Sequence, residues 1–185
     1  MTVVKPLVLD VDGTFLKTDM LFETLWAGLG SDPIATIRAT AANFRHPERL
    51  KAELARIAPL RTDLLPVNSE VADLALRSRM AGREVVLASA SDRSLVTRLA
   101  ADYGLSERVF ASDVTCNLKG PLKAAELVGA YGDRGFDYAG DNKVDMAVWE
   151  HAENAIVVGP VPQARELAAR GQNVVEIGGG WNWRA

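Results

Sequence analysis

The sequence predicts an α/β fold with a doubly wound parallel sheet and an all-helical segment inserted after the first strand. From residue 82 onward, short apolar runs alternate with amphipathic segments. Each run is apolar throughout, which is typical of strands buried on both faces of a parallel sheet. Between residues 18 and 81, in contrast, only helical signals occur. Right-handed crossovers then give a Rossmann-like sheet with helices on both faces.

The N-terminal half predicts one strand followed by helices. The strand is expected at about residues 6–10, where an apolar run ends on an acid. The first helix is expected to begin after Asp19 and to stop at Gly28 or Gly30. Each later helix opens on a capping residue or a proline and has apolar residues at helical spacing. These later helices are expected over 31–44, 46–57 and 68–82.

The C-terminal half predicts the rest of the sheet. Its strands are short β-rich runs, and its helices carry apolar residues on one side. The expected strands are 83–89, 109–111, 136–141, 155–158 and 173–177, and the expected helices are 91–104, 121–131, 144–152 and 161–171. The expected division is a core domain of residues 1–17 and 82–178, a helical cap of residues 18–81, and a tail or linker of residues 179–185.

Composition limits the range of functions. The chain has 185 residues and a formal net charge of -3, which argues against nucleic acid as a main partner. Cys116 is the single cysteine, so no internal disulfide can form. No apolar run approaches the roughly 18–20 residues that a membrane span needs. We therefore expect a cytoplasmic protein.

Polar side chains follow several of the expected strands at their carboxyl ends. Ligands of open parallel sheets bind at this edge. Each residue alone has an ordinary explanation, since Asp and Gly favour turns and acids favour the first turn of a helix. A requirement for stability alone gives no reason to gather four acids on one edge. The residues are Asp10, Asp12, Ser89, Lys119, Asp141 and Asp145.

The chemistry that uses such a set is phosphoryl transfer. Carboxylates hold Mg²⁺, a hard cation that prefers oxygen ligands. The metal cancels the repulsion between an aspartate nucleophile and an anionic phosphate, while a lysine and a hydroxyl bind the remaining oxygens. Covalent catalysis through an aspartyl-phosphate divides a very high barrier into two steps.

Four motifs occur in order over about residues 7–158: "LVLDVDGT", "VVLAS", the lysine of "LKG", and "GDNKVD". Over this range the chain resembles the haloacid dehalogenase-like (HAD) superfamily. The resemblance implies a HAD core with a C1-type helical cap that selects the substrate. Asp12 at the second motif position distinguishes the chain from the dehalogenases, which lack an acid there, and from the cation-pumping ATPases, which carry Thr.

The resemblance also implies roles for the site residues. Asp10 is the expected nucleophile, and Asp12 is the expected general acid and base. Ser89 and Lys119 are expected to bind the phosphoryl group; Lys123 competes with Lys119, which is preferred because a "KG" pair precedes the helix. The expected Mg²⁺ ligands are the carboxylates of Asp10 and Asp141 and the backbone carbonyl of Asp12. Asp145 is expected nearby, either as a further ligand or as a residue in contact with the ligands.

The expected function is a Mg²⁺-dependent phosphatase that hydrolyses a small or lipid-linked phosphomonoester. Lys143 stands where the phosphoserine phosphatase branch usually has Asn, which argues against phosphoserine itself. Two alternatives stay open: a non-catalytic regulatory domain, and a phosphotransferase such as a mutase. Arginines occur throughout the expected cap, and most of them are expected to be solvated: Arg38, Arg45, Arg49, Arg56 and Arg61.

The tail "EIGGGWNWRA" suggests a further partner. Trp181 and Trp183 next to Arg184 are typical of a membrane interface, although a tail packed on its own domain is an equal alternative. The whole chain resembles the HAD domain that precedes a polyprenyl (UbiA-type) prenyltransferase in some bacterial proteins. The resemblance implies a domain cut or encoded separately, which acts at the cytoplasmic face of the membrane near a prenyl-phosphate pathway.

Overall fold

The computed structural model describes residues 4–57, 60–160 and 162–178. These residues form a six-stranded sheet in the order β3-β2-β1-β4-β5-β6, and every neighbouring pair is parallel. The predicted doubly wound parallel sheet is confirmed. The strands are β1 (Leu7–Leu9), β2 (Val85–Asp92), β3 (Val109–Ser112), β4 (Asp137–Gly140), β5 (Asn154–Val158) and β6 (Asn173–Ile177).

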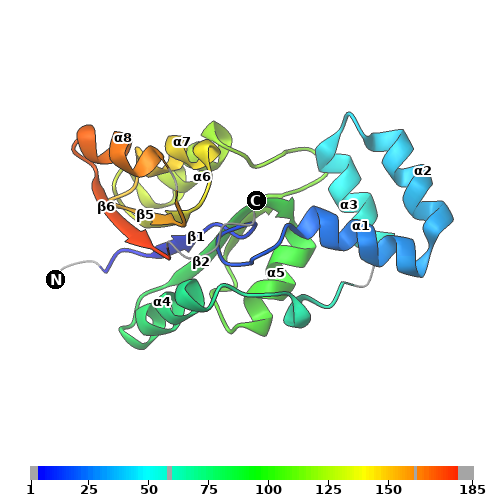
Figure 1. Cartoon of the computed structure of the whole chain (residues 1–185), viewed down its shortest axis with the longest axis horizontal. Coiled ribbons are helices and arrows are strands. Elements are labelled where there is room, and N and C mark those ends of the chain that lie inside the picture. The colour runs from blue at the N-terminus through cyan, green and yellow to red at the C-terminus, as the bar shows by residue number, and fades with distance from the viewer. Residues whose placement is uncertain (1–3, 58–59, 161, 179–185) are drawn as a thin grey trace.

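Helices cover both faces of the sheet. Along β1, Leu7 and Leu9 belong to one apolar cluster while Val8 belongs to the other, so the strand is buried on both sides as its apolar run predicts. The first face is covered by α4 (Ser69–Met80) and α5 (Arg93–Asp102). The second is covered by α6 (Pro121–Tyr131), α7 (Met146–Trp149) and α8 (Gln163–Ala169) (Figure 1).

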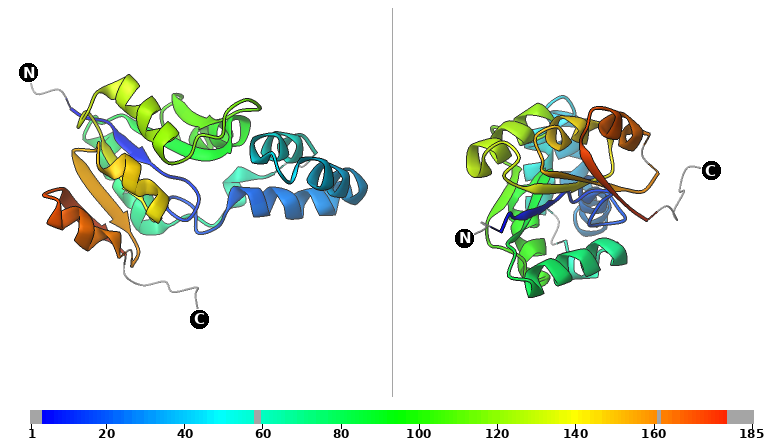
Figure 2. Two further views of the ribbon diagram at one scale, coloured as in Figure 1. Left: turned by 90° about the horizontal axis from the view of Figure 1, so that it is seen from above. Right: turned by 90° about the vertical axis from the view of Figure 1, so that its left-hand side faces the viewer.

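The helical insertion divides into two parts. Three helices contact one another at the end of the molecule and project away from the sheet (Figures 1 and 2): α1 (Met20–Ser31), α2 (Pro33–Asn43) and α3 (Pro47–Ile57). We call these three helices the cap helices. After a 3₁₀ turn at Thr62–Leu64, α4 instead buries Val71 and Ala75 against the sheet. The expected cap of residues 18–81 thus includes one helix whose apolar side belongs to the core of the sheet.

The first cap helix is longer than the sequence predicts. It continues through Gly28 and Gly30 to Ser31. Gly28 is buried, and a Cβ atom there would lie only 2.6 Å from the Thr36 hydroxyl of α2. The glycine therefore lets two helices approach closely and does not stop the first one.

The second cap helix has its apolar side in solvent. Ile34 and Ile37 of this helix, and Phe44 directly after it, are about 60% exposed, whereas Thr36 and Ala39 of the same helix are buried.

The helix that the sequence predicts at residues 144–152 is shorter than expected. It consists of a 3₁₀ turn at Lys143–Asp145 followed by the single turn of α7.

Two chain segments join the cap helices to the sheet and lie side by side. Leu16 is fully buried and bridges to Asp12 on one side and to Val67 on the other. The Asn68 amide donates to the Phe15 carbonyl at 2.8 Å. This paired stem fixes the base of the cap helices next to the end of β1.

The expected membrane interface falls on residues outside the described part of the chain. Trp181, Trp183 and Arg184 of the tail lie beyond residue 178. Within the described residues, no helix has both the length and the apolar character needed to cross a bilayer.

Candidate active site

The candidate site lies where the order of the strands reverses. From β1 the chain continues to β2 on one side of the sheet, and later returns to β4 on the other side of β1. Such a reversal opens a crevice at the carboxyl ends of the strands. Asp10 directly follows β1 and Asp141 directly follows β4. The Asp10 amide donates to the Ala139 carbonyl at 2.9 Å, which joins the two strand ends.

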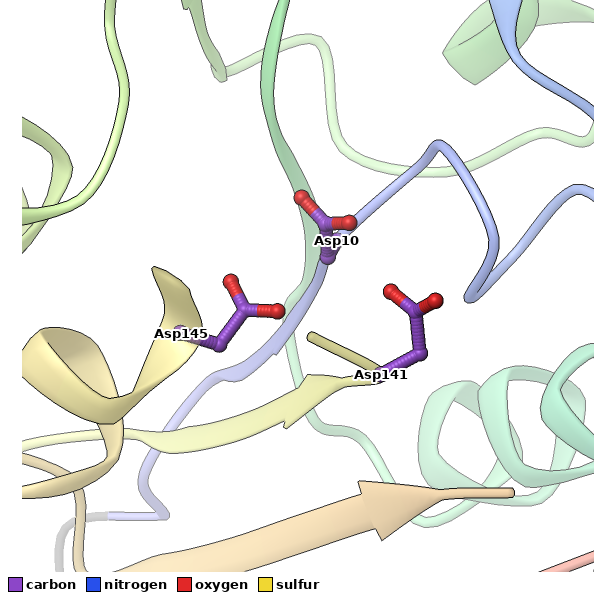
Figure 3. Close-up of side chains that lie close together, drawn as sticks. All are labelled: Asp10, Asp141 and Asp145. Carbon is purple, nitrogen blue, oxygen red and sulfur yellow. The ribbon is translucent and has the colours of Figure 1, made fainter. Parts of the chain in front are cut away.

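Three carboxylates converge at this edge of the sheet. Asp10, Asp141 and Asp145 each offer one oxygen, and these oxygens all lie within 4.8 Å of one another (Figure 3). Asp10 is 8% exposed and Asp145 is 3% exposed, while Asp141 is half-buried. Buried acids at this range repel one another unless a cation lies between them. Because all three donors are hard carboxylate oxygens, the cluster fits Mg²⁺.

Lys123 supplies one cation to this cluster. Its Nζ donates to Asp10 Oδ1 at 2.5 Å and to Tyr138 Oη at 2.9 Å, and lies 3.7 Å from Asp145 Oδ1. The side chain is almost fully buried. Burial favours the neutral amine, but the charges of Asp10 and Asp145 outweigh it, so the pKa of Lys123 is raised. The ammonium therefore stays charged beside Asp10.

Tyr138 connects Lys123 to Asp145. Its hydroxyl donates to Asp145 Oδ1 at 2.7 Å while accepting from the lysine. Burial, together with the charges of Asp145 and Asp10, raises the pKa of Tyr138 well above its usual range, so the hydroxyl keeps its proton. The other Asp145 oxygen accepts from the Asn142 amide at 3.1 Å. Asp145 is thus held by the protein at both oxygens.

Asp12 lies on the other side of Asp10, among hydroxyl groups. Its Oδ1 accepts from the Met20 amide at 2.7 Å, at the start of α1. Its Oδ2 accepts from Ser89 Oγ at 3.1 Å and from Ser91 Oγ at 2.8 Å. Burial raises the pKa of Asp12, although the hydrogen bonds from the Met20 amide and the serines oppose that rise. The carboxyl is therefore shifted toward its protonated form.

Asp141 is held close to the loop that follows β1. Its Oδ1 accepts from the Thr14 hydroxyl at 3.1 Å. Burial in the first place, and then the charge of Asp145, raises the pKa of Asp141 to about 6. Gly13 has φ +85, and a Cβ atom there would lie 2.4 Å from Asp141 Oδ2. Gly13 therefore turns the chain here and makes room for this carboxylate.

The structure places Lys123, and not Lys119, against the acids. Lys119 lies on the loop before α6 with its side chain exposed. Within the described residues, no hydrogen bond or ion pair joins it to the acid cluster. Lys123 lies in the first turn of α6, on the side that buries Ala124 and Leu127 against the sheet. A lysine in line with buried apolar residues is the sequence signal that favours Lys123.

Ser91 and Tyr138 also belong to the site, although the local sequence gives each of them a different expected role. Ser91 has the sequence position of a helix cap, but Asp92 caps α5 by accepting from the Ser94 amide at 2.9 Å. Ser91 is therefore free to bind Asp12. Tyr138 lies inside an apolar strand, where a tyrosine is an ordinary core residue. Nothing in its local sequence indicates that its hydroxyl meets two charged groups.

A separate cavity of about 650 Å³ lies in the region of the cap helices. It is lined by residues of α2 and α3 and by Val114, and none of the acids lines it. Arg38 and Arg49 are among the lining residues. The cavity therefore does not belong to the carboxylate site.

Solved structures with the same fold include several hydrolases. A HAD family hydrolase from Salmonella enterica serovar Typhi is 16% identical, with a TM-score of 0.61 over 95% of this chain and 69% of that chain. A substrate-bound phosphoserine phosphatase is 13% identical, with a TM-score of 0.60 over 90% of this chain and 91% of that one. A protein of unknown function from Bordetella pertussis is 18% identical, with a TM-score of 0.64, and covers 94% and 99%. The fold of this chain is the HAD fold.

One curated relative is longer than this chain. The uncharacterized protein y4nM from Sinorhizobium fredii is 34% identical over 154 residues, which are 83% of this chain and 30% of that protein. The chain thus spans less than a third of the length of this relative. No family model matches the sequence.

Proposed function

We propose that the chain is a Mg²⁺-dependent phosphatase that hydrolyses a phosphomonoester through an aspartyl-phosphate on Asp10. One observation carries the proposal: buried Asp10 contacts Lys123 and shares a carboxylate cluster with Asp141 and Asp145. The HAD fold supports it, because structural neighbours include phosphoserine phosphatases, one described as a phospho-aspartyl intermediate analogue.

In the proposed first step, a carboxylate oxygen of Asp10 forms a bond to phosphorus while the bond from phosphorus to the ester oxygen breaks. Lys123 holds the Asp10 carboxylate in place and has one donor left for a phosphoryl oxygen. We therefore assign the phosphate-binding lysine to Lys123 in place of Lys119. Ser89, buried within β2, is the proposed hydroxyl donor to the phosphoryl group; its hydroxyl, which donates to Asp12 in this structure, would then turn to the substrate.

Asp12 is the proposed acid and base. Its raised pKa favours the protonated carboxyl, which can give its proton to the leaving ester oxygen. The Met20 amide and the Ser91 hydroxyl then stabilise the Asp12 carboxylate. In the second step this carboxylate takes a proton from a water molecule that attacks phosphorus, which releases phosphate and regenerates Asp10.

The proposed metal site consists of the Asp10, Asp141 and Asp145 carboxylates. Asp145 has both oxygens engaged by the protein, so Asp10 and Asp141 are the principal proposed ligands. A bound Mg²⁺ would supply the positive charge that lets an anionic phosphate approach these acids. The backbone carbonyl of Asp12 stays a further proposed ligand.

A panel assay with phosphomonoesters and Mg²⁺ tests the proposal. We expect phosphate release that falls at least about 100-fold in Asp10→Asn, because an amide is a poor nucleophile. Asp73→Asn on the exposed side of α4 is the matched control and should hydrolyse like the wild type. Equal rates in Asp10→Asn and the wild type would refute the nucleophile. Isomerisation of a sugar phosphate would favour a phosphotransferase, and Mg²⁺ binding without turnover would favour a non-catalytic domain.

We also propose that the chain works next to a membrane prenyltransferase domain. The support is the resemblance to HAD domains that precede such enzymes, together with the greater length of the y4nM protein. A lipid-linked phosphomonoester would then be the substrate. Reading the coding sequence beyond Ala185 tests this partner directly.

A further inference from the structure

Lys51 reaches from the cap helices into the edge of the candidate site. It lies on α3, and its Nζ donates to the Ala90 carbonyl at 2.5 Å and to Asn117 Oδ1 at 3.1 Å. Ala90 belongs to β2 and stands between Ser89 and Ser91, the two serines that bind Asp12. The lysine thus joins the cap to the same strand end that holds the proposed acid and base.

The Lys51 ammonium is half-buried and has neutral partners. Both acceptors are uncharged oxygens, and within the described residues no carboxylate lies within 4 Å of Nζ. Burial lowers the pKa of Lys51, as expected for a cation taken out of water without a counter-ion. An ammonium has three donors, and two of them are used here. The third donor favours an anion that the described part of the chain does not itself provide within hydrogen-bond distance.

The position of Lys51 indicates which part of a substrate it meets. Lys51 donates to the Ala90 carbonyl, between the two serines whose hydroxyls bind Asp12, whereas the nucleophile Asp10 is contacted by Lys123. In the proposed mechanism Asp12 donates its proton to the leaving oxygen, so groups beyond Asp12 face the leaving group. Lys123 already supplies the cation on the side of Asp10. Lys51 is therefore placed for the leaving group and not for the transferred phosphoryl group.

We propose that Lys51 binds a second anionic group, a carboxylate or a phosphate, carried by the leaving group of the substrate. This inference rests on the proposed function, because the leaving-group side is defined by the role of Asp12. The substrate class is then a phosphomonoester with another acidic oxygen group close to the ester.

Equilibrium binding of two phosphonates tests the inference without turnover. Phosphonoacetate carries the second anion, and ethylphosphonate has a methyl group in its place. With saturating Mg²⁺, calorimetry on the full chain should show phosphonoacetate binding at least about 10-fold tighter, the size expected for one charge-assisted hydrogen bond. Lys51→Met should abolish this preference and leave ethylphosphonate affinity unchanged. Lys51→Arg should keep most of it.

Arg49→Met is the matched control, because Arg49 is an exposed cation on the same helix. It should keep the wild-type preference. Absence of a preference for phosphonoacetate in the wild type would overturn the inference. Equal loss of affinity for both phosphonates in Lys51→Met would also overturn it, because it would show that Lys51 only holds the cap helices in place. Failure of the wild type to bind either phosphonate would overturn it as well. Normal binding with no hydrolysis of any phosphomonoester would instead refute the proposed phosphatase and leave the second-anion site standing.

Discussion

At the residue scale, four buried polar side chains form one connected chain of contacts. Asp10 contacts Lys123, Lys123 contacts the Tyr138 hydroxyl, and that hydroxyl contacts Asp145. Burying charged groups is costly unless each is paired and hydrogen-bonded. Here one ammonium and one hydroxyl serve two acids, which leaves the acids one positive charge short. That shortage is what makes the cluster suited to a divalent cation.

The prediction at this scale concerns Lys123. We expect Lys123→Met to lower kcat/KM for p-nitrophenyl phosphate by about 10- to 100-fold, because a charged hydrogen bond contributes roughly 1.5–3 kcal/mol. Lys119→Met should stay within about threefold of the wild type, since its side chain is exposed. Steady-state kinetics measures both, and circular dichroism confirms that each variant is folded. The opposite ranking of the two variants would return the phosphate-binding role to Lys119.

At the element scale, the loop between β1 and α1 contributes residues both to the acid site and to the base of the cap helices. It places Asp10 and Asp12 at the end of β1, supplies Thr14 to Asp141, and then buries Phe15 and Leu16 in the stem. Its close turn depends on the positive φ of Gly13. One short segment therefore fixes both the acids and the base of the cap helices.

Gly13→Ala should weaken Mg²⁺ binding as well as lower the free energy of unfolding. Gly82 is the matched control, because it also has a positive φ (+77) but nothing lies within 4 Å of an added Cβ. Gly82→Ala should cost about 1–2 kcal/mol of unfolding free energy and leave Mg²⁺ affinity unchanged. Gly13→Ala should lose more stability and also weaken Mg²⁺ binding, since the new methyl group displaces the Asp141 carboxylate. Urea unfolding and Mg²⁺ calorimetry measure the two effects; unchanged Mg²⁺ affinity in Gly13→Ala would contradict the assigned packing.

At the scale of the whole molecule, the acid cluster ties stability to pH. The folded state raises the pKa of Asp141 to about 6, well above an ordinary aspartate. Between about pH 4 and pH 6, the folded chain therefore binds more protons at this group than the unfolded chain does. The slope of unfolding free energy against pH follows the protons bound by the unfolded state minus those bound by the folded state, so Asp141 makes it negative.

We accordingly expect the Asp141 contribution to the stability of the metal-free protein to fall by about 1–2 kcal/mol as the pH rises from 4 to 6. Asp141→Asn should remove this contribution, since an amide does not titrate. Saturating Mg²⁺ should also reduce the pH dependence of stability that Asp141 causes, because the bound metal favours the ionised carboxylate. Urea unfolding at several pH values, with and without Mg²⁺, gives the slopes. Identical slopes in Asp141→Asn and the metal-free wild type would show that other groups cause the pH dependence.

The sequence by itself determined the sheet and the edge at which the acids meet. Continuous apolar runs specify strands buried on both faces, and acids directly after such runs must lie at the carboxyl edge of a parallel sheet. Asp10 and Asp141 could therefore be placed at the same edge of the sheet from the sequence alone. The capping roles of Asp19 and Asp32 were equally local, and both side chains accept hydrogen bonds from the amides that follow them.

Only the tertiary structure decided which groups from distant segments complete the site. Lys119 and Lys123 are four residues apart in the sequence, but only Lys123 belongs to α6, whose packing on the sheet directs it to Asp10. Ser91 and Tyr138 have ordinary local roles until β2 and β4 are set on either side of β1. Lys51 resembles any helix-surface lysine until α3 is folded back over Ala90. Local sequence specifies backbone conformation and burial, but the partner of a polar side chain depends on which elements pack together.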